Sequence, residues 1–145
     1  RPAAIIIKDN KLLLVKSVYG GETFYILPGG GIEFGETIEE ALIRETREET
    51  GKKIKVIKPV YINEYIDKTD KSKRVVNIFF LSKIIGKEDN KLIDDNGKIK
   101  RIDWVNIDDL EKVDIKPDFL KTNLKTDLKN GFKNPSFYSV TFKNG

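Results

Sequence analysis

The chain has 145 residues, of which 39% are hydrophobic and 34% are charged, and its formal net charge is +4. This length suits a single domain over residues 1–145, and the hydrophobic content is enough for one core and too high for a disordered chain. The absence of cysteine and histidine excludes disulfides, thiolate metal sites and cysteine nucleophiles, and it removes the commonest general base, so any bound metal must be held by oxygen.

The first predicted elements are short β-strands. Apolar, β-branched runs at residues 3–7 and 12–15 predict two strands, and the polar residues 9–11 between them are typical of a hairpin turn. A third strand is predicted over residues 24–27, where Pro28 and the glycines after it end the run.

A helix is predicted next, over residues 38–50. Thr37 and Glu40 have the spacing of a capping box, and Gly51 supplies a C-terminal stop. The β-rich runs at residues 54–66 and 74–85 then predict two long strands.

The last third of the chain is predicted to alternate in the same way. A polar loop over residues 86–97 precedes a strand over 98–105, and Pro117 opens a C-terminal helix that ends near Gly131. The tail from Phe132 is either irregular or a last strand. The order of strands, helix, strands and helix predicts an α/β fold, in which helices cover the faces of a mixed sheet.

The charges are unevenly distributed along the chain. Residues 28–51 hold seven glutamates against Arg44 and Arg47, a balance of −5, so the rest of the chain carries +9. Lysine outnumbers arginine by 22 to 5, and arginine is the residue expected for base readout. The basic charge is therefore interpreted as solvated lysine, and an RNA-binding protein is the less favoured hypothesis.

The helix over residues 38–50 has an apolar side that becomes acidic along its length. The apolar members of this side are Ile38, Ala41 and Leu42, and the acidic members that continue it are Glu45, Glu48 and Glu49. Neighbouring carboxylates on a packed helix side repel one another and need a counter-charge. The pattern predicts a site for a divalent cation, and the alternative is that Arg44, Arg47 and nearby lysines neutralise the cluster.

The loop ahead of this helix is rich in glycine. Pro28 is followed by Gly29, Gly30 and Gly31, where the backbone can approach a ligand closely because no side chain intervenes. The spacing is neither that of a dinucleotide fingerprint nor that of a P-loop. A glycine run alone is often a plain turn, but next to the acidic helix side it indicates ligand binding.

The stretch from Gly30 to Lys52 resembles the Nudix box, Gly-x5-Glu-x7-Arg-Glu-U-x-Glu-Glu-x-Gly-U, in which U is a bulky aliphatic residue. All seven fixed positions match, and they are Gly30, Glu36, Arg44, Glu45, Glu48, Glu49 and Gly51. The departures are Thr46 and Lys52 at the two U positions, which affect local packing more than chemistry. The similarity to the family covers about residues 3 to 110.

The resemblance implies a Nudix-type α/β/α sandwich and a MutT-like, metal-dependent pyrophosphohydrolase that cleaves a nucleoside diphosphate linked to another group. It implies that Mg²⁺, or Mn²⁺ as a substitute, is bound by the carboxylates of Glu45, Glu48, Glu49 and Glu36 and by the Gly30 carbonyl. Arg44 would hold a glutamate in place, and the general base would be Glu45 or Glu49. A further acidic ligand is sought in the loop that contains Glu88, Asp89, Asp94 and Asp95.

The resemblance leaves the substrate open. Gly29, Gly30 and Gly31 are expected to contact it, and Tyr19, Phe24 and Tyr25 are candidates to stack on a base. Each of these aromatic residues, and Trp104, also fits a place in the core. Spacing rules for ADP-ribose and dinucleoside polyphosphate hydrolases are not met, so a nucleoside triphosphate, a nucleotide sugar and a dinucleotide all stay open. A catalytically silent nucleotide-binding module of the same fold is the alternative function.

Partners and location follow from composition and from the resemblance. The expected partner is a small nucleotide, with neither a membrane nor nucleic acid, and a homodimer stays open. The apolar runs are too short for a membrane span and no signal-peptide pattern opens the chain, so a cytoplasmic protein is expected. Because the chain starts at Arg1 and contains no Met, its natural start is expected to be processed or to lie outside this sequence.

Overall fold

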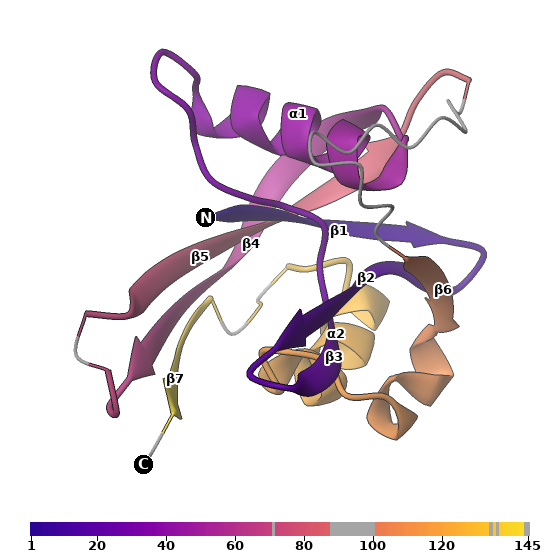
Figure 1. Cartoon of the computed structure of the whole chain (residues 1–145). Helices are drawn as coiled ribbons and strands as arrows, with labels where there is room; N and C mark the ends of the chain where they lie inside the picture. Colours follow the sequence, from indigo (N-terminus) through magenta and orange to yellow (C-terminus); the bar gives the residue numbers. More distant parts are fainter. Residues whose placement is uncertain (71, 88–100, 134, 136, 144–145) are drawn as a thin grey trace.

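A computed structural model of the chain describes residues 1–70, 72–87, 101–133, 135 and 137–143 (Figure 1). Its elements are β1 (Pro2–Lys8), β2 (Lys11–Tyr19), β3 (Glu22–Ile26), α1 (Ile38–Thr50), β4 (Ile54–Asp67), β5 (Arg74–Ile84), β6 (Ile102–Asn106), a 3-10 helix η1 (Ile107–Lys112), α2 (Phe119–Lys129) and β7 (Tyr138–Lys143). Among these residues no helix is both long enough and apolar enough to cross a membrane.

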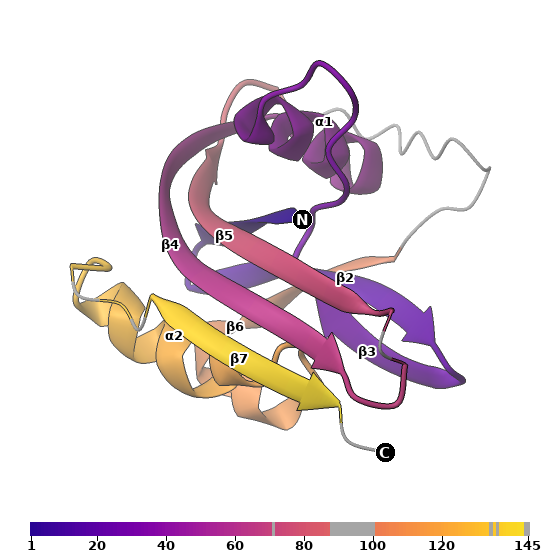
Figure 2. The same ribbon diagram turned by 90° about the vertical axis from the view of Figure 1, so that its left-hand side faces the viewer.

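The strands form a mixed sheet, as the sequence predicts. Their order is β3-β2-β1-β5-β4-β7, and β6 pairs with β2. β1 pairs with β5, and β4 with β7, in parallel, whereas the other pairings are antiparallel. Helices α1 and α2 lie on opposite sides of the central strands, which gives the predicted α/β/α arrangement (Figures 1 and 2).

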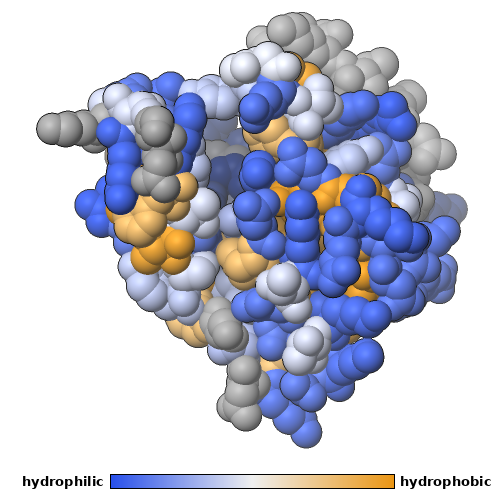
Figure 3. All heavy atoms as spheres, turned by 90° about the horizontal axis from the view of Figure 1, so that it is seen from below, coloured by the Kyte–Doolittle hydropathy of each residue, from blue (hydrophilic) through white to orange (hydrophobic). Residues whose placement is uncertain are grey.

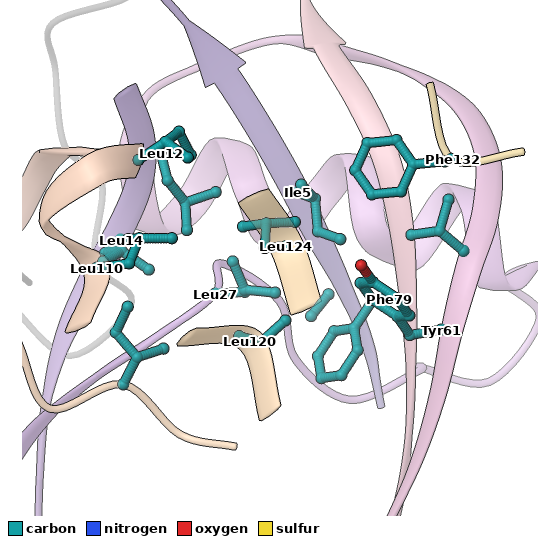
Figure 4. Close-up of a cluster of buried hydrophobic side chains, with 14 residues drawn as sticks. Ile5, Leu12, Leu14, Leu27, Tyr61, Phe79, Leu110, Leu120, Leu124 and Phe132 are labelled. Carbon is teal, nitrogen blue, oxygen red and sulfur yellow. The ribbon is translucent and has the colours of Figure 1, made fainter. Parts of the chain in front are cut away.

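Strand β1 separates two apolar clusters because its alternate side chains point to opposite faces of the sheet. Ala3 and Ile5 belong to the larger cluster, which α2 covers with Leu120 and Leu124 (Figure 4). The smaller cluster contains Ala4, Ile6, Leu13 and Ile54 and is covered by Leu42 of α1. Burial on both faces explains why β1 is a continuous apolar run and does not alternate.

Helix α1 has the bounds and caps that the sequence predicts. The Thr37 side chain accepts a hydrogen bond from the Glu40 amide at 3.1 Å, and Glu40 Oε2 accepts one from the Thr37 amide at 2.8 Å. Gly51 adopts the left-handed conformation, with φ of 71°, and its N–H bonds to the Arg47 carbonyl. These caps fix where α1 begins and ends and therefore which residues face the sheet.

The structure differs from the predicted elements mainly at their ends. β2 and β3 extend to Tyr19 and from Glu22, because they pair with each other around Gly20 and Gly21, whose φ angles are 59° and 79°. The tail forms β7, which pairs with β4. The buried Asn63 of β4 donates hydrogen bonds of 3.0 Å to Ser139 Oγ and to Thr141 Oγ1 of β7.

Three predicted boundaries near the C-terminus are wrong by a few residues. α2 begins at Phe119, two residues after Pro117, and its last residue is Lys129. The strand predicted over 98–105 is observed as β6, one residue further on at its C-terminal end, and residues 98–100 lie outside the described part. The 3-10 helix after β6 is not predicted, because its six residues offer only two apolar positions at helical spacing, Ile107 and Leu110, which are too few to show a period.

The outer ends of two hairpins meet on the lower side of the molecule. Lys73, next to β5, donates a 2.5 Å hydrogen bond from Nζ to the Tyr19 hydroxyl at the end of β2. Seen from below, the surface has a hollow (Figure 3). On one side of the hollow lies the part that carries β7 and the ends of β4 and β5, and on the other side lies the rest of the molecule. Hydrophilic side chains line much of this face.

Candidate active site

The acidic side of α1 continues from the apolar side that packs on the sheet. Leu42 is fully buried in the smaller cluster, and Glu49, two turns on, is only 7% exposed. The side chains of Glu45 and Glu48 are 20% and 35% exposed, so the three carboxylates grade from the protein interior to the surface. The helix periodicity therefore brings a carboxylate into a place where a hydrocarbon would ordinarily pack.

The glycine-rich loop closes against the start of β1 and against these carboxylates. A Cβ at Gly30 would lie 2.5 Å from Glu45 Oε2 and 2.7 Å from Glu45 Oε1. A Cβ at Gly29 would overlap the Pro2 carbonyl oxygen and lie 2.7 Å from Ala3 Cα, whereas one at Gly31 would meet no atom within 4 Å. Two of the three glycines are thus required by close approach, one to β1 and one to a carboxylate.

The backbone of the same loop also reaches the buried carboxylate. The Gly29 N–H donates to Glu49 Oε1 at 3.4 Å. Two hydrogen bonds fix the loop on β1, from Gly30 N to Pro2 O at 3.2 Å and from Ala4 N to Pro28 O at 2.8 Å. Gly29 and Glu49 are 20 residues apart in the chain. The hydrogen bonds from the loop to β1 fix the position of Gly29 beside Glu49.

Arg44 ties the loop to the helix carboxylates. Its Nε donates to Glu36 Oε2 at 2.7 Å and its Nη2 to Glu36 Oε1 at 2.9 Å, a bidentate pair. Nη1 donates to Glu45 Oε1 at 3.0 Å and to Glu48 Oε2 at 3.3 Å, and Nη2 also donates to the Gly31 carbonyl at 3.1 Å. Arg44 thus supplies counter-charge to two of the three helix glutamates.

The pair between Arg44 and Glu36 shifts the pKa of both groups. Hydrogen bonds from Arg44, and then from the Glu33 amide, lower the pKa of the Glu36 carboxyl to about 2. The hydrogen bonds to Glu36, and after them those to Glu45, raise the pKa of the Arg44 guanidinium above its ordinary value. Both groups are therefore charged at every pH at which the protein would work, and the link between loop and helix is permanently ionic.

The carboxylates of Glu45, Glu48 and Glu49 have the chemistry to bind a hard divalent cation, but their oxygens do not converge on one point. Glu45, Glu48 and Glu49 offer carboxylate oxygens from one turn of helix, and the lack of a side chain at Gly30 lets the loop backbone approach Glu45. Within the described residues, no three acidic side chains converge closely enough to hold an ion as they stand. Arg44 already binds Glu45 and Glu48, so a cation at these two carboxylates would have to compete with it.

The aromatic candidates lie away from the carboxylates or in the core. Tyr19 pairs with Glu22 at the far end of the hairpin, and Glu22 is five residues from Leu27, which corresponds to roughly 17 Å along a strand. Tyr25 packs on the larger cluster and its hydroxyl donates to Asp103 Oδ2 at 2.6 Å, and Trp104 packs on the smaller one. Phe24 is half-buried on β3. Tyr19 and Phe24 stay predictions as substrate contacts.

Four candidate ligands lie outside the described residues, and one residue near the site was missed by the sequence reasoning. Glu88, Asp89, Asp94 and Asp95 lie outside the described residues. Arg1 was not singled out by the sequence, yet its guanidinium lies near the acidic helix side: burial lowers its pKa, and the charges of Glu49 and Glu45 oppose that effect. Only an arginine directly ahead of an apolar strand could have signalled it, and sequence alone does not place that strand end beside α1.

Comparisons with known proteins place these features in a family context. The sequence model described as NUDIX domain matches residues 1–123. An ADP-ribose pyrophosphatase of Methanocaldococcus jannaschii is 42% identical over 87 residues, which cover 58% of this chain and 50% of that protein, so this chain spans about half the relative's length. The nucleoside triphosphatase NudI of Enterobacter sp. (strain 638) is 30% identical over 124 residues, covering 76% and 84%. A NUDIX hydrolase structure from Nitrosomonas europaea shares the fold with a TM-score of 0.74, 24% identity and coverage of 93% and 90%.

Proposed function

The chain belongs to the NUDIX domain family, and on that premise we propose that it is a hydrolase of phosphoanhydride bonds that cleaves a nucleoside diphosphate linked to another group. The observation that carries the proposal is the set of three glutamates on the packed side of α1, with Gly30 closed against Glu45. A carboxylate cluster repels a diphosphate, so the two become compatible only when cations lie between and around them.

Glu45, Glu48 and Glu49, with the Gly30 carbonyl, would hold Mg²⁺ or Mn²⁺. A bound divalent cation would neutralise charge on the diphosphate and lower the pKa of an attacking water. The chain's own contribution is to keep these oxygens on one side of a capped helix. A side chain at position 30 would clash with the Glu45 carboxylate, so the close approach of loop and helix requires glycine there.

Glu36 and Arg44 would act as a clamp on the helix carboxylates. Both oxygens of Glu36 already accept hydrogen bonds, from Arg44 and from the Glu33 amide at 2.7 Å. These bonds hold Glu36 against Arg44, so its first role in the proposal is to orient Arg44. Arg44 in turn orients Glu45 and Glu48.

The proton of the attacking water would be taken by a carboxylate, because the chain contains no histidine. Glu45 and Glu49 are the two candidates on α1. Glu45 accepts a hydrogen bond from Arg44, and Glu49 accepts one from the Gly29 amide. The pH dependence of turnover in Glu45→Gln and Glu49→Gln distinguishes them, since removal of the base abolishes the acid limb that it causes.

The relatives direct the choice of substrates for the test. One is named an ADP-ribose pyrophosphatase and another a nucleoside triphosphatase, so the two leading classes are a nucleotide sugar and a nucleoside triphosphate. The experiment is a panel of both classes, assayed with Mg²⁺ and with identification of the products. Release of a nucleoside monophosphate from one class supports the proposal. The absence of turnover on the whole panel, together with measurable nucleotide binding, would support the silent module instead.

A further inference from the structure

Arg1 lies directly ahead of β1 and is held in place by contacts on two sides. Its backbone nitrogen donates to the Val76 carbonyl at 2.7 Å, and its carbonyl accepts from the Ile78 amide at 3.0 Å. Nη2 of its side chain donates to the Leu27 carbonyl at 3.2 Å. The fold therefore sets the position of this cation, beside Leu27, the residue that precedes the glycine-rich loop.

The same loop joins Arg1 to the carboxylates of α1. Leu27, whose carbonyl binds Arg1, stands two residues before Gly29, whose N–H contacts Glu49. The charges of Glu49 and Glu45 both act on the Arg1 guanidinium, which is also partly withdrawn from solvent. The contact ion pair of Glu45 is with Arg44, at 3.0 Å.

Arg44 supplies the contact counter-charge to Glu45 and Glu48, and Arg1 adds a second cation near the same helix side. Among the described contacts, the Arg1 guanidinium uses one of its N–H donors, on Leu27, and a guanidinium has five. The planar fork of the remaining donors matches phosphate oxygens, and arginine stays protonated at any working pH.

We propose that Arg1 is a substrate-binding residue that contacts a non-bridging oxygen of the substrate's diphosphate and holds the diphosphate against the carboxylate side of α1. This inference rests on the proposed function, because the ligand is the diphosphate that a phosphoanhydride hydrolase must bind. It adds a residue outside the stretch from Gly30 to Lys52. It also explains why a cation is built into the start of β1, next to a loop that has no basic side chain of its own.

The test measures binding of α,β-methylene-ADP, whose P–C–P bridge is not hydrolysed, by calorimetry in the presence of Mg²⁺, together with kcat and KM on the cleaved substrate. Arg1→Gln is expected to weaken analogue binding and kcat/KM about ten- to hundredfold, the effect of losing a hydrogen bond to a charged group. Arg1→Lys keeps the charge without the fork and is expected to recover part of the loss. Arg47→Gln, which removes the same charge from an exposed position on α1, is the matched control and is expected to bind within about twofold of wild type.

The outcomes separate this inference from the proposed function. A folded Arg1→Gln variant with wild-type analogue binding and kcat/KM would show that Arg1 only ties β1 to Leu27, and would overturn the inference. If the Gln variant does not fold, the Lys variant decides: binding weakened severalfold supports the inference, and wild-type binding overturns it. A wild-type protein that neither binds the analogue nor turns over any substrate overturns the proposed function itself.

Discussion

Replacing Gly30 by alanine adds one methyl group at the point where the loop meets the carboxylates. The new Cβ would lie 2.5 Å from Glu45 Oε2, where ordinary contact begins near 3.4 Å, so the carboxylate has to move by about 1 Å. Its neighbour is the end of a flexible side chain, so the fold is expected to survive. A displacement of about 1 Å in a catalytic group costs roughly a hundredfold in rate.

The assay compares kcat, the Mg²⁺ concentration for half-maximal activity and the melting temperature across the three loop glycines. Gly30→Ala is expected to lose about a hundredfold in kcat and to need more Mg²⁺, with a melting temperature close to that of wild type. Gly31→Ala, whose methyl meets no atom within 4 Å, is expected to behave as wild type. Gly29→Ala, which overlaps the Pro2 carbonyl, is expected to lose stability. Wild-type kcat and Mg²⁺ dependence in Gly30→Ala would refute the reasoning.

Two further predictions concern stability. The Thr46 hydroxyl is buried and has no hydrogen-bond partner in the described part of the chain, so Thr46→Val is expected to raise the free energy of unfolding by about 1 kcal/mol, measured by urea denaturation. Thr50→Val is the control, because the Thr50 hydroxyl donates to the Thr46 carbonyl at 2.6 Å and accepts from the Lys52 amide. It is expected to lower the free energy of unfolding by about 1–3 kcal/mol, and equal effects of the two variants would contradict the account. Because the folded protein lowers the pKa of Glu36, this carboxylate contributes to the free energy of unfolding. The contribution is fully present above the unfolded-state pKa near 4.5 and is lost as pH falls toward about 2. Melting temperatures of wild type and Glu36→Gln should therefore differ most above pH 5 and converge between pH 4.5 and 2, and a constant difference across that range would contradict the assignment.

Local patterns predicted much of the fold from the sequence. The bounds of α1 were predicted because a capping box and a left-handed glycine act within a few residues of the helix ends. The sequence leaves the tail undecided between a strand and an irregular segment, because the hydrogen bonds of β7 are with β4, and the buried partner Asn63 is more than 70 residues away. Residues 138–143 do alternate apolar and polar side chains, but so short a local pattern does not show which strand they pair with.

The candidate site divides in the same way. Helical periodicity alone places Glu45, Glu48 and Glu49 on one side, and the structure puts Glu49 in the interior. The period does not show that Arg44 would contact two of these carboxylates, because side-chain reach depends on where the loop carrying Glu36 lies. Arg1 could not be found at all, since only the tertiary fold brings the start of β1 to the end of α1.

The most direct test of the central claim is the rate of product formation as a function of free Mg²⁺, measured for wild type and for Glu48→Gln on whichever substrate the panel identifies. The account predicts no product in excess chelator, saturable activation by Mg²⁺ in wild type, and turnover at least about a hundredfold lower in the folded variant. Full wild-type turnover in excess chelator, or equal turnover in the variant, would contradict the claim that the helix carboxylates hold a catalytic cation.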